Sequence, residues 1–312
     1  MSDALSLVLL GPLEDIGSNP AFFGEVVIGG VMAGMLYSLV ALGFVLIFKA
    51  SGVFNFAQGA MVLFAALTLV GLMEQGVPVW AALALTAVVM IVLAFGIERV
   101  VLRPLVNQEH IILFMATIGL NFFLEGFGEM LWGANVKKLD VGLPDKSFMV
   151  AGMQMNQLEL SAGLIAAVLV TVLAIFFQKT RIGRALRAVA DDHAAALSIG
   201  IPLKTIWVVV WSVAGIVALV AGIMWGAKSG VQFSLALIAL KALPVLILGG
   251  FDSVPGAIAG GLIIGVGEKI GEVYWGPLVG GAIENWFAYV LALAFLLIRP
   301  QGLFGEKIIE RV

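Results

Sequence analysis

The stretch VVIGGVMAGMLYSLVALGFVLIF, residues 26–48, decides the class of fold. No charged residue interrupts it between Glu25 and Lys49, and about 20 apolar residues suffice for an α-helix to cross the hydrocarbon core of a membrane. Lipid offers no hydrogen bonds, so each backbone polar group must be paired within the segment, as a helix does. The stretch therefore predicts a transmembrane helix.

The rest of the chain repeats this pattern. Of its 312 residues, 62% are hydrophobic and 12% charged, and the mean hydropathy is +1.11, which is far from the composition of a soluble domain. We predict an all-α integral membrane protein, a polytopic helical bundle of about eight to nine transmembrane segments in a single domain over residues 1–312. The predicted segments are 26–48, 53–73, 79–98, 111–132, 159–178, 205–226, 236–250, 254–272 and 284–299.

Two of these segments are weak, and we expect broken or re-entrant helices there. Segment 53–73 begins in the polar run from Ser51 to Gln58, and segment 236–250 is short and contains Lys241 and Pro244. Irregular backbone at membrane depth is tolerated where it is buried in protein or lines a water-filled cavity. If one weak segment does not cross, the N-terminus changes side.

The basic residues indicate the orientation. Alternating nine segments places most of them on one side: Lys49, Arg99, Arg103, Lys179, Arg181, Arg184, Arg187, Lys204, Arg299, Lys307 and Arg311. Only Lys137, Lys138, Lys146 and Lys228 fall on the other side. By the positive-inside rule the first set is cytoplasmic, so the C-terminus is predicted inside and the N-terminus outside.

The predicted cytoplasmic segment 179–203 has the pattern of a short amphipathic helix. Its apolar stripe consists of Leu186, Val189, Ala190, His193 and Leu197, and a second stripe consists of Arg184, Arg187 and Asp191. A basic helix resting on anionic lipid is one interpretation. The mixed charge and the small alanine face favour a helix that docks in a groove of a partner protein.

Several polar residues fall within apolar segments and are candidates for a permeation path. Asn55 and Gln58 open the second segment, and Asn121, Glu125 and Glu129 share one face of the fourth. Polar groups at membrane depth are costly unless they meet a cavity or a partner helix. Hydrogen bonds between helices are the equally supported alternative for both sets.

Residues 241–256 form a third group, KALPVLILGGFDSVPG, in which Gly249, Gly250 and the prolines predict an interrupted helix. Lys241 must reach toward the interface, pair with an acid or face water, and its place near the outer end of its segment favours the first. Glu268, Lys269 and Glu272 lie together near an outer helix end and are expected to form a local ion pair at helical spacing. Glycines at four-residue spacing, such as Gly261 and Gly265, predict close helix packing.

Catalytic and metal-binding patterns are missing from the sequence. It contains no phosphate-binding loop of the form G-x-x-x-x-G-K-[ST], no G-x-S-x-G and no H-E-x-x-H. It has no cysteine, and neither of its two histidines stands at metal spacing from another ligand type. We therefore expect no enzyme activity, no metal site, no cofactor in this chain and no nucleic-acid partner.

Four blocks in order resemble the permease family of branched-chain amino acid ABC transporters, in particular the first of its two paired permease subunits. They are SGVFNFAQG at 51–59, ERVVLRPL at 98–105, the segment from RIGRA at 181–185 to ADD at 190–192, and LGG at 248–250 with PGA at 255–257. The ending RPQGLFG at 299–305 is similar to the tail of that family.

The resemblance implies a permease subunit in a bacterial inner membrane, with a second related permease, two cytoplasmic ATPases that bind the ATP, and a periplasmic solute-binding protein as partners. Segment 179–203 would then be the helix that couples to an ATPase. Its implied coupling residues are Arg181, Gly183, Arg184, Arg187, Ala188, Asp191 and Asp192. The candidates for the translocation path remain those of the polar and interrupted segments: Asn55, Gln58, Gly59, Asn121, Glu125, Lys241, Gly249 and Gly250.

Departures from the family pattern leave the substrate open. Where members commonly have histidine and then glutamate, this chain has Gln58 and Ala60, so urea, amides and aromatic acids stand beside branched-chain amino acids. A transporter driven by an ion gradient is the alternative of a different class. Such proteins usually place an acid or a charge pair near mid-membrane, for which this chain offers Lys241 and the face from Asn121 to Glu129.

Overall fold

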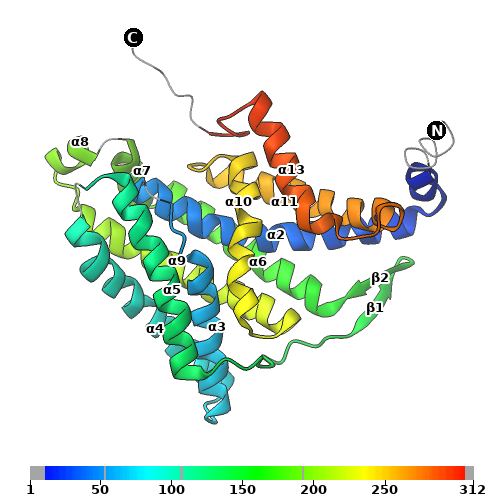
Figure 1. Ribbon diagram of the computed structural model, residues 1–312, viewed down its shortest axis with the longest axis horizontal. Coiled ribbons are helices and arrows are strands. Elements are labelled where there is room, and N and C mark those ends of the chain that lie inside the picture. The colour runs from blue at the N-terminus through cyan, green and yellow to red at the C-terminus, as the bar shows by residue number, and fades with distance from the viewer. Residues whose placement is uncertain (1–10, 53, 106–107, 192, 306–312) are drawn as a thin grey trace.

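The computed structural model describes residues 11–52, 54–105, 108–191 and 193–305, and most of them are helical (Figure 1). In chain order the elements are α2 (Pro20–Ser51), α3 (Gln58–Glu74), α4 (Val79–Gly96), η1 (Ile97–Leu102), η2 (Arg103–Leu105), α5 (His110–Trp132), β1 (Ser147–Val150), β2 (Met153–Asn156), α6 (Gln157–Lys179), α7 (Arg181–Asp191), α8 (His193–Ser198), α9 (Leu203–Ser229), η3 (Phe233–Leu237), α10 (Ile238–Gly249), α11 (Val254–Ile270), η4 (Gly271–Trp275), α12 (Gly276–Val279) and α13 (Ile283–Ile298).

The described part of the chain contains six helical stretches that are long and apolar enough to cross a membrane. They are Pro20–Ser51, Val79–Leu105, Ile111–Trp132, Gln157–Lys179, Leu203–Ser229 and Val254–Val279. Three shorter apolar helices, Gln58–Glu74, Phe233–Gly249 and Ile283–Ile298, lie at the other predicted segments. The protein is thus an all-α, multi-pass membrane protein.

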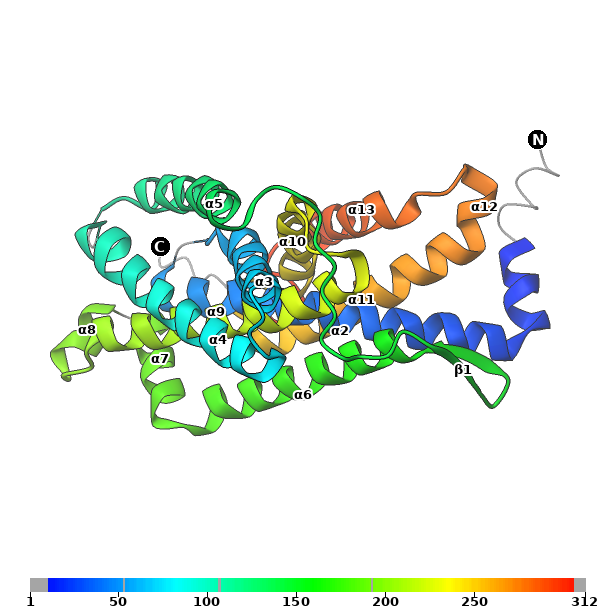
Figure 2. The ribbon, with the colours of Figure 1, turned by 90° about the horizontal axis from the view of Figure 1, so that it is seen from below.

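Helix α2 is the centre of the bundle. The Asn19 side chain accepts a hydrogen bond from the Phe22 amide at 3.1 Å, Pro20 occupies the first turn, and Gly52 ends the helix in the left-handed conformation with a φ of 68°. Between these ends α2 packs against α6, α9, α10 and α11, and Figure 2 shows α11 running alongside it. Its C-terminal half is therefore buried almost without interruption.

Glycines allow α2 and α11 to touch backbone to backbone. A Cβ on Gly34 would lie 2.6 Å from the carbonyl oxygen of Gly261, and a Cβ on Gly30 would lie 2.6 Å from Cα of Val266. Gly265 likewise faces the Gly34 backbone. The prediction that Gly261 and Gly265 serve close helix packing is confirmed.

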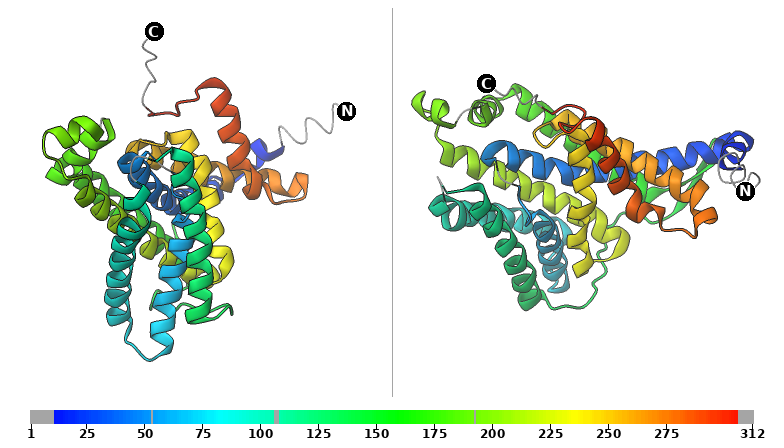
Figure 3. Two further views of the ribbon diagram at one scale, coloured as in Figure 1. Left: turned by 60° about the vertical axis from the view of Figure 1, so that its left-hand side comes forward. Right: turned by 45° about the horizontal axis from the view of Figure 1, so that its top comes forward.

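Helices α3, α4 and α5 form a group that is steeply inclined to α2 (Figures 1 and 3). Helix α9 joins this group to the rest, because it packs against α2, α3 and α4. Its buried face contains Trp207, whose indole nitrogen donates to the Ala50 carbonyl at 3.0 Å. This arrangement leaves one face of α5 exposed along the side of the bundle.

The two segments predicted to be weak, 53–73 and 236–250, both begin with irregular backbone. Residues 54–57 precede α3 without regular helix, and the segment predicted at 236–250 begins as the 3₁₀ helix η3 before it becomes α10. Pro244 lies buried inside α10. The expectation of interrupted helices at these two places agrees with the structure.

One element was not predicted. Residues between α5 and α6 form the antiparallel hairpin β1–β2, in which Ser147 pairs with Asn156 and Val150 with Met153. The hairpin lies beside the N-terminal end of α2, where the amide of Gln154 donates to Glu25 Oε2 at 2.9 Å. Four-residue strands on an otherwise polar loop carry too weak an alternation to be recognised from the sequence.

Candidate functional site

A cavity of about 250 Å³ lies between α5 and the η3–α10 segment, and we call it the α5 cavity. Its lining consists of Phe44, Phe54, Phe56, Ile118, Asn121, Phe122, Glu125, Ala236, Leu237, Ala239, Leu240 and Leu243. The rim is exposed on the side of the bundle, since Phe122 is 67% and Leu237 59% exposed. The α5 cavity is therefore a mostly apolar hollow with aromatic and aliphatic walls, and it opens on the exposed side of the bundle.

Asn121 and Glu125 are the two side chains with polar groups in this lining. They stand one helical turn apart on α5, and Asn121 Nδ2 donates to Glu125 Oε1 at 3.0 Å. In the described ranges the ion pairs are Arg103–Glu98, Lys137–Glu74 and Lys228–Glu159, so Glu125 takes part in none of them. The sequence placed both residues on one face, and the structure directs that face into a cavity.

The aromatic wall of the cavity is held to α5 by Thr117. The Phe56 amide donates to Thr117 Oγ1 at 3.3 Å, and this hydroxyl lies 3.2 Å from the Phe54 carbonyl oxygen. The Phe54 ring lies 4.7 Å from those of both Phe44 and Phe56, measured between centroids. These contacts fix the irregular residues before α3 as one side of the α5 cavity.

Gly59 of α3 allows η3, which forms another wall of the α5 cavity, to pack closely against α3. A Cβ at this position would collide with the Ala236 carbonyl oxygen, so only glycine lets η3 approach α3 this closely. Gly59 thus shapes the α5 cavity from behind without lining it.

Asn55 and Gln58 lie behind the cavity wall. Both side chains are fully buried, and Asn55 Oδ1 accepts from the Ala57 amide at 3.1 Å while Nδ2 donates to Gln58 Oε1 at 3.4 Å. Gln58 Nε2 in turn donates to the Ala214 carbonyl of α9 at 3.5 Å. Of the two roles considered, this geometry agrees with hydrogen bonding between segments.

Lys241 lies apart from the α5 cavity, although other residues of its helix, α10, line that cavity. Its Nζ donates to the Glu284 carbonyl at 3.4 Å and stands 5.9 Å from the centroid of the Tyr37 ring. Glu268 is buried nearby and accepts a hydrogen bond from Tyr37. The local ion pair expected among Glu268, Lys269 and Glu272 is not one of the ion pairs in the described residues. Glu268 is buried between helices, and Glu272 accepts hydrogen bonds from backbone amides instead.

Gly249 and Gly250 join α10 to the C-terminal segment. The amides of Leu303 and Phe304 donate to the carbonyls of Leu248 and Gly249 at 2.8 and 3.1 Å, which satisfies groups that the end of a helix leaves open. Gly250 has a φ of 106° and packs directly on the backbone of Gly305. The interruption at this end of α10 is thus a packed junction.

The predicted cytoplasmic helix is present as α7 followed by α8. Leu186 and Val189 are buried, whereas Arg181 and Arg184 are exposed, so α7 is amphipathic as predicted. Leu197 departs from the predicted apolar stripe because it is 54% exposed on α8. The predicted stripe spans two helices, because α7 ends at Asp191 and α8 begins at His193, so a single helical periodicity does not apply across it.

The predicted coupling residues divide into three groups. Gly183 is packed against the Phe177 carbonyl, and Arg187 donates to the same carbonyl at 2.8 Å, so these residues attach α7 to the end of α6. Arg181, Arg184 and the half-buried Ala188 remain accessible. The side chain of Asp191 and all of Asp192 lie outside the described residues.

Comparison with known proteins places the chain in a family. Residues 26–299 match the family model described as "Branched-chain amino acid transport system / permease component". The chain belongs to this permease family. It is a permease component, and its relatives are transport permeases rather than enzymes.

Three relatives share most of the permease's length. The high-affinity branched-chain amino acid transport system permease protein BraD of Pseudomonas aeruginosa is 31% identical over 91% of this chain and 96% of its own. The corresponding protein LivH of Escherichia coli is 28% identical over 93% and 98%. A probable branched-chain amino acid transport permease LivH of Methanocaldococcus jannaschii is 28% identical over 94% of both chains.

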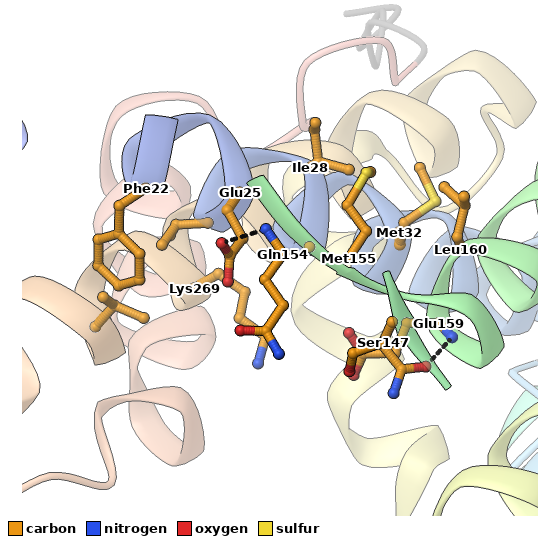
Figure 4. Close-up of a pocket in the computed structure, with 14 residues that line it drawn as sticks. Phe22, Glu25, Ile28, Met32, Ser147, Gln154, Met155, Glu159, Leu160 and Lys269 are labelled. Atoms are coloured by element: carbon orange, nitrogen blue, oxygen red, sulfur yellow. Dashed lines mark hydrogen bonds between the residues drawn. The ribbon is translucent and has the colours of Figure 1, made fainter. Parts of the chain in front are cut away.

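A second cavity of the permease, of about 320 Å³, was not predicted (Figure 4). It lies between the N-terminal part of α2, the hairpin and α6, and Glu25, Glu159 and Lys269 are among its lining residues. Glu159 also pairs with Lys228 at 2.6 Å. Its charged residues come from parts of the sequence that are far apart, so no local pattern marked them as one site.

The sequence also missed the aromatic wall of the α5 cavity. Phe54 and Phe56 stand on either side of Asn55 in the motif SGVFNFAQG, of which the amide side chains and Gly59, but not the aromatic rings, were predicted to have a role. The available signal was their two-residue spacing, which in extended backbone puts both rings on one side.

Proposed function

We propose that the permease is one of two paired membrane subunits of an ATP-driven importer, and that the α5 cavity forms its half of the path for branched-chain amino acids. The observation that carries the proposal is the composition of that cavity. It combines an aromatic and aliphatic wall with one carboxylate inside a membrane-spanning helix, and it opens on the exposed side of the bundle, where a second permease would close it.

The names of the three relatives above support branched-chain amino acids as substrate over urea, amides and aromatic acids. An importer of this type takes its energy from ATP bound by partner ATPases, so this chain needs no cofactor. A solute-binding protein on the periplasmic side completes the assembly. The ion-gradient transporter has less support, because these relatives are named as permease components of branched-chain amino acid transport systems.

In this proposal the permease lies in the inner membrane with its C-terminus in the cytoplasm and eight to nine crossings in one domain. The positive charge around α7 supports the orientation, since Arg181, Arg184 and Arg187 lie together there. Segment 179–203 within this domain is then the coupling segment. Buried Leu186 and Val189 anchor it to the bundle, and the exposed arginines are free to contact an ATPase.

The experiment reconstitutes the permease with its partner subunits in proteoliposomes and measures ATP-dependent uptake of L-leucine. Arg181→Glu combined with Arg184→Glu is expected to lower both uptake and solute-stimulated ATP hydrolysis by about tenfold or more, because charge reversal opposes docking. Lys146→Glu is the matched control, since this exposed lysine lies beside the hairpin on the predicted outer side. Uptake that persists without ATP, or equal activity of the charge-reversed and control proteins, would contradict the proposal.

A further inference from the structure

We infer that Glu125 binds the ammonium group of the transported amino acid in the α5 cavity, with Asn121 as the residue that positions the carboxylate. The inference rests on the proposed function and names the residue that recognises the substrate.

The charge of the Glu125 carboxylate is the first observation that supports this role. Glu125 lies seven residues before the end of α5, about 10 Å inside a membrane-spanning helix at the helical rise per residue. A carboxylate at such depth normally faces a cavity or pairs with a cation, and the residues that the structure describes offer it no ion pair. A cationic group that enters the cavity and leaves again would satisfy this carboxylate.

The second step concerns geometry. Asn121 donates to Glu125 Oε1 from the preceding turn, which orients the carboxylate, while Oε2 accepts no hydrogen bond from any part of the chain described. An ammonium group carries three N–H donors and needs such acceptors. Glu125 therefore presents one held oxygen and one free oxygen toward the α5 cavity.

The third step concerns the shape and polarity of the remaining wall. Phe44, Phe54, Phe56 and the aliphatic residues of η3 and α10 surround the carboxylate with apolar surface. A volume of about 250 Å³ lies below the range typical of pockets for drug-sized ligands, so it fits a small solute. A branched aliphatic side chain buried there would be stabilised by the hydrophobic effect.

Among the described residues, the lining of the α5 cavity contains an acidic residue but no basic one. This chain alone would therefore bind only the ammonium end of a zwitterion. No lysine, arginine or histidine belongs to the lining given by the described residues, so nothing there matches the substrate's carboxylate. That group would be bound across the open side, by the second permease. Gln58 and Ala60 stand where family members commonly have histidine and glutamate. Their presence then does not exclude a ligand with an ammonium group, because Glu125 of α5 supplies the acidic group.

The test compares Glu125→Gln with Glu129→Gln in the reconstituted importer. Glu129 lies one turn further along α5, is exposed and is not part of the cavity lining, so it is a matched control. At saturating leucine-loaded binding protein, Glu125→Gln is expected to lower leucine uptake at least tenfold, whereas Glu129→Gln retains uptake.

A second measurement reports occupancy directly. The chain has no cysteine, so Leu240→Cys places a single thiol in the lining, where Leu240 is 44% exposed. Leucine-loaded binding protein with ATP is expected to slow modification of this thiol by a methanethiosulfonate reagent. Glu125→Gln should abolish that protection and Glu129→Gln should keep it.

The outcomes separate the two proposals. If the wild-type assembly does not import leucine, the proposed substrate is wrong. If it does, but Glu125→Gln imports and protects as well as Glu129→Gln, the proposed function stands and Glu125 is instead a polar contact between subunits.

Discussion

Tyr37 Oη donates a hydrogen bond to Glu268 Oε2 over 2.9 Å, and this joins α2 to α11 across 231 positions of sequence. Glu268 is 4% exposed, and its second oxygen is buried without a hydrogen-bond partner in the described residues. Lys241 of α10 and Glu284 of α13 also act on it electrostatically, as does its neighbour Lys269 on α11. Four helices thus meet around one buried carboxylate.

Tyr37→Phe is expected to destabilise the purified permease by about 1.5–3 kcal/mol, because it leaves a buried charged group with one bond fewer. Tyr274→Phe is the control, since the Tyr274 hydroxyl is buried without a partner in the ranges described and its loss should be neutral or stabilising. Thermal unfolding in detergent measures both. An equal loss in the two variants would show that the hydrogen bond contributes nothing specific.

Gly30→Ala is expected to lower the midpoint of thermal unfolding, while Gly29→Ala leaves it nearly unchanged. A Cβ at Gly30 would lie 2.6 Å from the α11 backbone, whereas a Cβ at Gly29 meets nothing within 4 Å. Overpacking of this kind costs about 1–3 kcal/mol, and both changes share the same gain in helix propensity. If the two variants unfold at the same temperature, α2 and α11 are not in backbone contact.

Arg187→Ala is expected to destabilise the junction of α6 and α7 by about 1–2 kcal/mol, because the guanidinium donates to the carbonyls of Phe177 and Gln178 at 2.8 and 3.3 Å. Protease sensitivity of the 177–191 region, with unfolding temperature, measures the effect. The neighbouring change Arg184→Ala should spare stability, since that side chain is exposed. The reverse ranking would mean that Arg187 serves docking rather than structure.

The hydropathy of the chain predicted where the helices lie, because the stability of a helix in lipid depends mainly on the residues of that segment. All nine predicted segments coincide with described helices, and the polar start at Ser51 and the proline in 236–250 correctly marked the irregular ones. The amphipathic α7 followed from local spacing for the same reason. Its continuation to Leu197 did not, since Leu197 belongs to a second helix, α8, whose exposed face is not set by the periodicity of α7.

The polar residues show the limit of such reasoning. Asn55, Gln58, Asn121 and Glu125 were equally good candidates for a path, yet the first two are sealed behind α9 and the last two line a cavity. The sequence by itself determined that this is a multi-pass helical membrane protein. Lipid offers no hydrogen bonds, so each apolar segment must pair its own backbone groups as a helix, and this depends only on that segment. Only the tertiary structure decided which polar groups meet a partner, as for Tyr37 and Glu268, and which face an open cavity, because that depends on the helix that packs opposite.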